Sequence, residues 1–132
     1  MRRTVDTRFF LTHFLAETDD LKTKTAKKMI ELQRETAVVP TIVLHEVYKF
    51  MYDHVGKEVA QLRVSSITNS GLEIIDLNTE IALASARLRC RYRDLPTADS
   101  VVAGTSMETR SRRVITDDPH FREVEEIHSE WL

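Results

Sequence analysis

The sequence is poor in cysteine, glycine and proline, with one, three and three of them respectively. A single cysteine cannot close an intramolecular disulfide, and no Cys or His group has the spacing of a zinc site, so we expect a cytoplasmic protein. Few glycines and prolines predict short loops and many helices. No apolar run approaches the roughly 18 residues of a membrane span, and the first residues lack the pattern of a signal peptide. We therefore expect a protein that is neither exported nor membrane-spanning.

An excess of positive charge is absent too. The chain has 19 Lys and Arg against 21 Asp and Glu, a formal net charge of -2 at pH 7. No global positive field attracts nucleic acid, so such a partner would need a local basic patch. Hydrophobic residues form 42% and charged residues 30% of the 132 residues, as in ordinary folded proteins. The length suits a single domain, residues 1–132.

Apolar residues alternate along the chain between helical and strand patterns. The helical spacing predicts helices over about residues 7–17, 21–36, 41–55, 57–68, 79–90 and 96–107, with Thr41 as the N-cap of the third. Strands are predicted to end near residue 6 and to cover about 37–39, 72–77, 113–116 and 124–127. Parallel neighbours in a sheet need crossover helices, so this alternation predicts a three-layer α/β/α sandwich with a mostly parallel five-stranded sheet.

Carboxylates follow two of the predicted strands. Asp6 ends the first strand, and Asp117 and Asp118 follow the fourth. Asp99 lies in the first turn of the helix before that fourth strand. In parallel sheets, ligands bind outside the carboxyl ends of the strands near the point where the strand order reverses. Clustered carboxylates repel one another unless a cation joins them, and oxygen ligands favour Mg²⁺ or Mn²⁺.

Each carboxylate taken singly also has a structural explanation. Asp99 in a first helical turn is favoured by the helix dipole, and Asp118 before Pro119 has the pattern of an N-cap. Glu46 can be an exposed residue of the third helix, and Asp6 can cap the first helix. The residues alone leave these alternatives open.

Four segments together resemble the signature segments of the PIN-domain family. They are VDTRFFL at 5–11, LHEVYKF at 44–50, LPTADSVVAGTSME at 95–108 and VITDDPHF at 114–121. They occur in the family's order and at its usual separations, across essentially the whole chain. Within the family, the small VapC-like toxin ribonucleases of toxin–antitoxin pairs are closest in size. The resemblance implies a PIN-like fold, hydrolysis of RNA by a metal-activated water with Mg²⁺ or Mn²⁺, an antitoxin partner and a homodimer.

Carried over onto matching positions, the resemblance assigns the catalytic metal site to Asp6, Glu46, Asp99 and Asp118. It implies that Glu46 completes the ligand set directly or through water. Thr116 matches the hydroxyl residue that supports the last carboxylate. The family's T-x-D-x-x-F pattern selects Asp118 over Asp117, because Phe121 lies three residues beyond Asp118, and Asp117 is left in a supporting role.

Arginines near these segments are candidates for RNA contacts. Arg8 stands where the family commonly has Asn or Ser, and we expect it to contact a substrate phosphate or to pair with a site carboxylate. Arg91 and Arg93 lie just upstream of the predicted metal site, where the RNA backbone would pass. A further group, residues 110–113, contains three arginines. Both groups can also be solvated faces with favourable charges at helix C-termini.

Other chemistries find little support. His45 and Glu46 do not form an H-E-x-x-H motif, because Lys49 occupies the position of the second histidine. We expect His120 to be a surface or capping residue. A receiver-like switch would need an acidic pair after the first strand and a lysine after the last, and neither is present. The alternatives that stay open are an RNA-processing nuclease without an antitoxin and a non-catalytic module that binds metal or RNA.

Overall fold

The computed structural model describes residues 2–132. Its helices are α1 (Thr7–Leu15), α2 (Asp19–Arg34), α3 (Thr41–His54), α4 (Lys57–Thr68), α5 (Thr79–Arg91), α6 (Thr97–Glu108) and a 3₁₀ turn, η1 (Pro119–Glu123). Its strands are β1 (Thr4–Val5), β2 (Val38–Pro40), β3 (Glu73–Ile75), β4 (Arg113–Ile115) and β5 (His128–Glu130). Among these residues, no helix is both long and apolar enough to cross a membrane.

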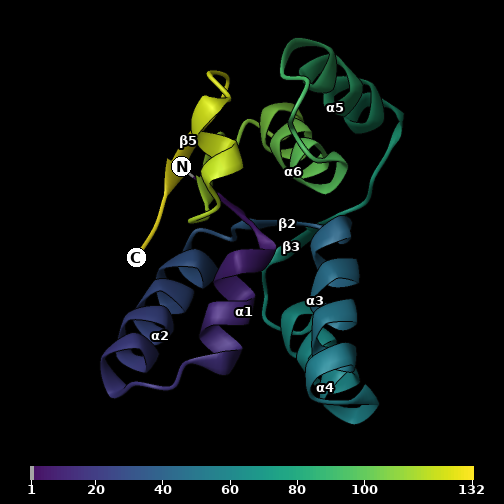
Figure 1. The fold of residues 1–132 in the computed structure, drawn as a ribbon. Coiled ribbons are helices and arrows are strands. Elements are labelled where there is room, and N and C mark those ends of the chain that lie inside the picture. The colour runs from purple at the N-terminus through teal and green to yellow at the C-terminus, as the bar shows by residue number, and fades with distance from the viewer. Residues whose placement is uncertain (1) are drawn as a thin grey trace.

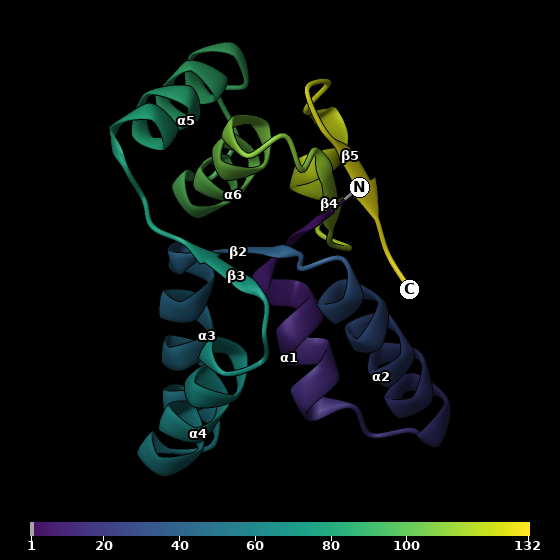
Figure 2. The same ribbon diagram turned by 180° about the vertical axis from the view of Figure 1, so that it is seen from behind.

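All five strands lie parallel in one sheet with the order β3-β2-β1-β4-β5. Helices α1 to α4 lie on one side of the sheet and α5 and α6 on the other (Figures 1 and 2). The predicted three-layer α/β/α sandwich with a five-stranded sheet is therefore confirmed. The strand order reverses between β1 and β4, where Val5 pairs with Ile115. This is the position at which the carboxyl ends of parallel strands most often hold a ligand.

Buried apolar side chains join the sheet to both helical layers. Val5, Val39 and Ile115 are fully buried in the strands, and Phe9 and Phe10 of α1 are fully buried beneath them. The two phenylalanine rings pack edge to face, with 5.6 Å between their centroids. Because both faces of the sheet are covered, the interior strand β2 is apolar and buried without alternation, as parallel strands usually are.

The last strand differs from its prediction. Residues 124–127 form a turn, and β5 begins at His128 instead. Val124 and Ile127 are nearly fully buried, so their apolar character reflects anchoring of this turn to the core. The polar segment His128–Glu130 pairs with β4 as an edge strand, where polar side chains face water.

Helix boundaries differ from the predictions by one or two residues. The sequence predicts Thr41 as the N-cap of α3, but Pro40 holds that position and makes no side-chain cap bond. Pro96 likewise is the N-cap of α6, which begins at Thr97. For α5, the side chain of Asn78 is the N-cap and accepts from the backbone N–H of Ile81 at 2.9 Å.

Helices α5 and α6 cross closely at Gly104. A Cβ atom there would lie 3.1 Å from the backbone nitrogen of Ser85 and 3.2 Å from the carbonyl oxygen of Ile81. Beside this crossing, the hydroxyl oxygens of Ser85 and Ser100 lie 2.6 Å apart, and both side chains are buried. The small residue and the hydroxyl pair set the position of α6, which carries Asp99 in its first turn.

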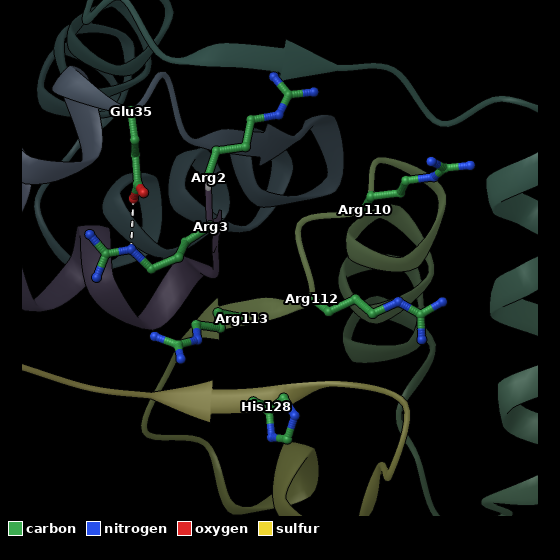
Figure 3. A pocket seen from close by; sticks show the side chains of 7 residues that line it. All are labelled: Arg2, Arg3, Glu35, Arg110, Arg112, Arg113 and His128. Carbon is green, nitrogen blue, oxygen red and sulfur yellow. Dashed lines mark hydrogen bonds and ion pairs between the residues drawn. The ribbon is translucent and has the colours of Figure 1, made fainter.

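The amino edge of the sheet carries arginines (Figure 3). Arg2 and Arg3 precede β1, and Arg112 precedes β4. At the carboxyl edge, Asp6 follows β1 and Asp118 lies beyond β4.

We predict that Gly104→Val destabilises the protein by about 2 kcal/mol or more, because the added side chain meets backbone atoms that cannot move aside. Chemical denaturation measures the free energy of unfolding. Ala86→Val is the control, since Ala86 is exposed on α5 and gains the same branched side chain without a close neighbour. Equal stability losses in the two variants would contradict the close crossing.

Candidate active site

Asp6 lies between β1 and α1, at the reversal of strand order. Its backbone N–H donates to the carbonyl of Ile115 at 3.2 Å, which extends the pairing with β4 past the end of β1. Its side chain is only 2% exposed, and its Oδ2 accepts from the hydroxyl of Thr116 at 2.7 Å. Asp6 occupies the N-cap position of α1 but makes no side-chain cap bond. The capping role that the sequence allowed is therefore not its function.

Thr116 connects the first and last acidic segments. While its hydroxyl donates to Asp6, the same oxygen accepts from the backbone N–H of Asp118 at 3.1 Å. The expected supporting hydroxyl is thus in contact with Asp6 and with the main chain of Asp118. Asp118 also caps η1, since its Oδ1 accepts from the N–H of His120 at 2.9 Å. Capping uses one carboxylate oxygen and leaves the other for a ligand.

Asp99 and Glu46 reach the same place from two helices on opposite sides of the sheet. Asp99 lies in the first turn of α6 and is 9% exposed. Glu46 extends from α3, and the hydroxyl of Thr7 donates to its Oε1 at 2.7 Å. One pocket of about 250 Å³ is lined by all four predicted carboxylates together with other residues: Asp6, Thr7, Arg8, Leu11, Glu46, Phe50, Asp99 and Asp118. The predicted quartet is therefore brought together by the fold.

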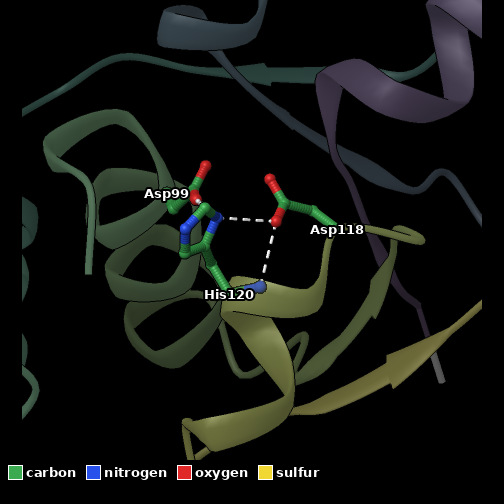
Figure 4. A group of neighbouring side chains, drawn as sticks. All are labelled: Asp99, Asp118 and His120. Atoms are coloured by element: carbon green, nitrogen blue, oxygen red, sulfur yellow. Dashed lines mark hydrogen bonds and ion pairs between the residues drawn. The ribbon is translucent and has the colours of Figure 1, made fainter. Parts of the chain in front are cut away.

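His120 belongs to this cluster, although the sequence predicted only a surface or capping role. Its Nδ1 lies 2.8 Å from Oδ1 of Asp118 and 3.4 Å from Oδ2 of Asp99 (Figure 4). One ligand atom from each of these three residues falls within 4.8 Å of the others, a spacing suited to one metal ion. The missed signal is the D-P-H sequence, because a proline-initiated turn brings the second residue after the cap back over the cap side chain.

Asp117 is not among the residues that line the pocket. Its two carboxylate oxygens lie 2.7 and 3.3 Å from Nε and an Nη atom of Arg8, in a bidentate pair at the protein surface. Arg8 thus pairs with a carboxylate outside the pocket, although its own side chain lines the pocket, and its contact with a metal-site carboxylate or a substrate phosphate stays a prediction. The placement agrees with the choice of Asp118 over Asp117 for the metal site.

Arg91 and Arg93 do not line the acidic pocket. Arg91 forms ion pairs with Glu125 at 2.7 Å and with Glu126 at 3.3 Å. Arg93 is exposed in the loop before α6. Their contact with RNA therefore stays a prediction, and Arg91 would first have to leave its two carboxylates.

Burial and mutual repulsion shift the acid strength of the two most enclosed carboxyls. Burial, followed by the nearby charges of Glu46 and Asp118, raises the pKa of Asp6 to about 6, although bonds from Thr116 and Thr7 act in the other direction. Burial, followed by the charges of Asp118 and Asp6, raises the pKa of Asp99 to about 7. Both groups would be more readily ionised beside a cation.

This donor set fits a hard divalent cation. Carboxylate oxygens are the preferred ligands of Mg²⁺ and Mn²⁺, and a single imidazole suits Mn²⁺ as well. Arg8 is the one Lys or Arg side chain among those that line the pocket, and it is already paired with Asp117. The carboxylates therefore lack a protein cation that would neutralise them, which a bound metal ion would supply.

The chain thus forms a parallel α/β domain, and a pocket lined by carboxylates suited to a divalent cation lies where the strand order of its sheet reverses. Residues 4–127 match the PIN domain, and the chain therefore belongs to the PIN-domain family. A sequence comparison with curated proteins found no match.

Solved structures with the same fold include chains of toxin–antitoxin complexes. A chain of VapBC2 from Rickettsia felis, bound to a promoter DNA fragment, superposes with a TM-score of 0.80 at 19% identity, covering 99% of this chain and 98% of that one. DNA-bound VapBC from Salmonella typhimurium gives 0.77 at 18% identity, with 99% and 98% covered. VapC20 of Mycobacterium tuberculosis, described as a toxin that cleaves the sarcin-ricin loop, gives 0.75 at 14% identity, with 92% and 94% covered.

We predict that the metal-free protein loses stability as pH rises from about 4 to about 7, because the raised pKa values of Asp6 and Asp99 favour the folded state only while these groups are protonated. A carboxyl with a raised folded pKa stabilises below its unfolded pKa, and this contribution disappears as pH passes the folded pKa. Thermal melting in EDTA measures it. Mn²⁺ should raise the melting temperature more at about pH 8 than at about pH 5, since binding displaces protons.

Asp99→Asn separates this effect from general acid sensitivity. Near pH 8 it should stabilise the metal-free protein by about 1 to 3 kcal/mol, because it removes a charge that is costly in the pocket. It should also abolish most of the Mn²⁺-dependent gain. Asp94→Asn is the matched control at an exposed position outside the pocket. If Asp99→Asn melted like wild type with and without Mn²⁺, the pocket would not be a metal site.

Proposed function

We propose that the protein is a divalent-metal-dependent endoribonuclease and the toxin of a type II toxin–antitoxin pair. The observation that carries the proposal is the convergence of Asp6, Glu46, Asp99 and Asp118 on one pocket at the switch point of a PIN domain. The VapBC structures with the same fold favour the toxin over an RNA-processing enzyme that has no antitoxin.

The pocket residues divide into groups that bind the cation and groups that hold those ligands in place. Asp6, Asp99 and Asp118 would bind Mg²⁺ or Mn²⁺, with Glu46 acting directly or through water. Thr116 holds Asp6, and Thr7 holds Glu46, each through a hydroxyl that donates at 2.7 Å. The bound cation supplies charge neutralisation for the attacking and leaving oxygens and a lowered pKa for water. Fixed ligands of this kind make the site selective for the geometry of phosphodiester hydrolysis.

His120 has a place in this proposal. Its Nδ1 bridges Asp118 and Asp99, so the imidazole can hold their side chains in the absence of metal. Half of its surface is exposed, which leaves it free to turn outward or to contribute a nitrogen ligand. Arg8 at the rim can exchange its pairing with Asp117 for a substrate phosphate, because both partners present two oxygens to the guanidinium.

We predict that the protein cleaves single-stranded RNA with Mg²⁺ or Mn²⁺ and is inactive in EDTA. Asp6→Asn and Asp99→Asn should each lower the rate by about two orders of magnitude or more, because a ligand of the transition-state clamp is lost. Initial rates on a labelled RNA measure this. Asp94→Asn, exposed and outside the pocket, should keep the wild-type rate. Undiminished cleavage by Asp99→Asn would contradict the proposed chemistry.

A second pocket beside the acidic one is suited to a partner segment. It has a volume of about 480 Å³ and is lined by Ile42, His45, Glu46, Lys49, Phe50, Asp53, His54, Thr97 and Ala98. Glu46 and Phe50 also line the acidic pocket, so the two pockets adjoin at these side chains. From the sequence, the helical spacing of Val43, Val47 and Phe50 predicts a groove beside α3 for the apolar residues of such a segment. Phe50 lines this pocket, but Val43 and Val47 are fully buried in the core, so the prediction is wrong for these two.

An antitoxin tail can use both pockets. We propose that it inserts an arginine among the carboxylates, where charge-assisted bonds replace the cation, and places apolar side chains beside Ile42 and Phe50. We predict that the affinity of an antitoxin-tail peptide falls as Mn²⁺ is raised and falls further in Asp99→Asn. Fluorescence anisotropy measures it. Equal affinity for wild type and Asp99→Asn, without metal dependence, would show that the tail binds elsewhere.

Homodimer formation stays an expectation from the resemblance. From the sequence, the apolar residues of two helices could form its interface: Val43, Val47 and Met51 of α3, or Leu83 and Leu88 of α5. All of these except Leu83 are buried in the core of the single chain and are not available for such a contact. Leu83 is 53% exposed on α5 and remains a candidate contact, which light scattering of wild type and Leu83→Lys would examine.

A further inference from the structure

A pocket of about 660 Å³ opens at the amino edge of the sheet, away from the carboxylates. We call it the arginine pocket, and its lining residues are Arg2, Arg3, Glu35, Arg110, Arg112, Arg113 and His128 (Figure 3). Five arginines and one glutamate meet there in a chain whose formal net charge is -2. The proposed catalytic chemistry uses none of these residues.

The parallel topology concentrates this charge. Arg2 and Arg3 lie before β1, Arg112 and Arg113 lie at the start of β4, and His128 begins β5. These three strands are neighbours in the sheet, so their amino ends lie side by side. Segments far apart in the sequence therefore supply one positive surface.

Two of the arginines are already committed to carboxylates. Arg3 pairs with Glu35 at 2.6 Å, with Glu31 at 3.5 Å and with Glu130. Arg2 pairs with Glu73. The side chain of Arg3 is only 15% exposed, so its role is to join the ends of β1, α2 and β5.

Arg110, Arg112 and Arg113 keep most of their donors available. Within residues 2–132, no carboxylate lies in ion-pair range of Arg110 or Arg112, and Arg112 donates only to the backbone carbonyl of Glu126 at 3.2 Å. Arg113 has one distant pairing, at 3.8 Å from Glu130. All three are exposed, and in Figure 3 the guanidinium groups of Arg110 and Arg112 extend in the same direction.

The turn that presents Arg110 normally favours glycine. Arg110 has a φ of 56° and follows the cap of α6, where its N–H donates to Met107 and that of Ser111 donates to Ser106. This bonding pattern ends many helices with a glycine in the left-handed conformation. Replacing Arg110 by glycine therefore removes the charge without opposing the backbone, which gives a clean test of its side chain.

We propose that the arginine pocket binds phosphates of the RNA backbone, as a second contact outside the active site; this rests on the proposed function. The acidic pocket repels phosphates, so the positive charge that attracts RNA has to lie elsewhere. Guanidinium groups bind phosphate through paired donors. None of the lining residues is Phe, Tyr or Trp, so the contact involves no such stacking platform and is independent of base sequence.

Along the strand direction, the two ends of the sheet lie close together. Its longest strands have three residues and span roughly 10 Å, since each residue rises about 3.3 Å. Helices cover both faces of the sheet, so an RNA strand held at Arg110 and Arg112 would have to pass around the domain to reach the carboxylates. Long RNA would gain affinity from this contact, and a fragment too short to span both edges would not.

The test compares Arg110→Gly/Arg112→Gln with a control of equal charge change, Lys22→Gln/Lys27→Gln on the exposed face of α2. Both pairs are placed in Asp99→Asn protein, so that cleavage does not disturb binding. Anisotropy of a labelled single-stranded RNA is measured over a range of KCl concentrations. The arginine variant should bind about tenfold more weakly at low salt, and its log–log salt slope should fall by about 1.4, or about 0.7 for each lost contact. The lysine control should match its parent.

Two further measurements separate the possible outcomes. With Asp99 intact, the arginine variant should raise KM for long RNA but leave cleavage of a trinucleotide unchanged. If RNA binding depends on Arg110 and Arg112 but the protein with Asp99 intact cleaves no RNA, the proposed function fails and the assignment of the arginine pocket stands. An unchanged salt slope in the arginine variant would overturn the assignment. It would also be overturned if a glutamate-rich peptide displaced the labelled RNA as well as unlabelled RNA does, because the pocket would then bind an acidic protein segment. Arg112→Gln alone, with its melting temperature, repeats the test if the double variant is unstable.

Discussion

Four carboxylates held together in a partly dry pocket are the constraint on which the rest of this structure depends. Bringing like charges out of water costs free energy, and the raised pKa values of Asp6 and Asp99 measure that cost in this pocket. The folded state tolerates this unfavourable free energy because packing and hydrogen bonds in the rest of the fold offset it. A bound cation would offset this cost, which is the physical basis of the metal site proposed above.

Hydrogen bonds and close packing in the scaffold restrict the positions of the carboxylates. A parallel sheet places Asp6 and Asp118 beyond neighbouring strands, and the hydroxyl of Thr116 joins the two segments. On one side of the sheet, α3 brings Glu46 against Thr7. On the other side, the close crossing at Gly104 fixes the position of α6 and thus of Asp99. Packing far from the pocket therefore sets the distances within it.

Acidic and basic side chains concentrate at different ends of one short sheet. Carboxylates gather beyond the carboxyl ends of the strands, and arginines gather before the amino ends, with Arg3 joined to Glu35 and Glu130 beneath the arginine pocket. In a protein of small negative net charge, this separation makes the proposed cation site and the proposed phosphate contact compatible on one molecule.

Much of this protein was determined by local sequence patterns. Helical periodicity located α1 to α6, and a strand followed by Asp6 located the first carboxylate of the pocket. The T-x-D-x-x-F pattern of the resembled family distinguished Asp118 from Asp117, in agreement with their placement. Tertiary structure alone decided what depends on neighbours distant in sequence. Because Val124 and Ile127 are buried in a turn, the last strand begins at His128. The turn of η1 places His120 beside Asp118 and Asp99. The strand order places the arginines at one edge of the sheet. The periodicity of apolar residues indicates which side chains are buried, whereas contacts between segments distant in the sequence form only when the chain folds.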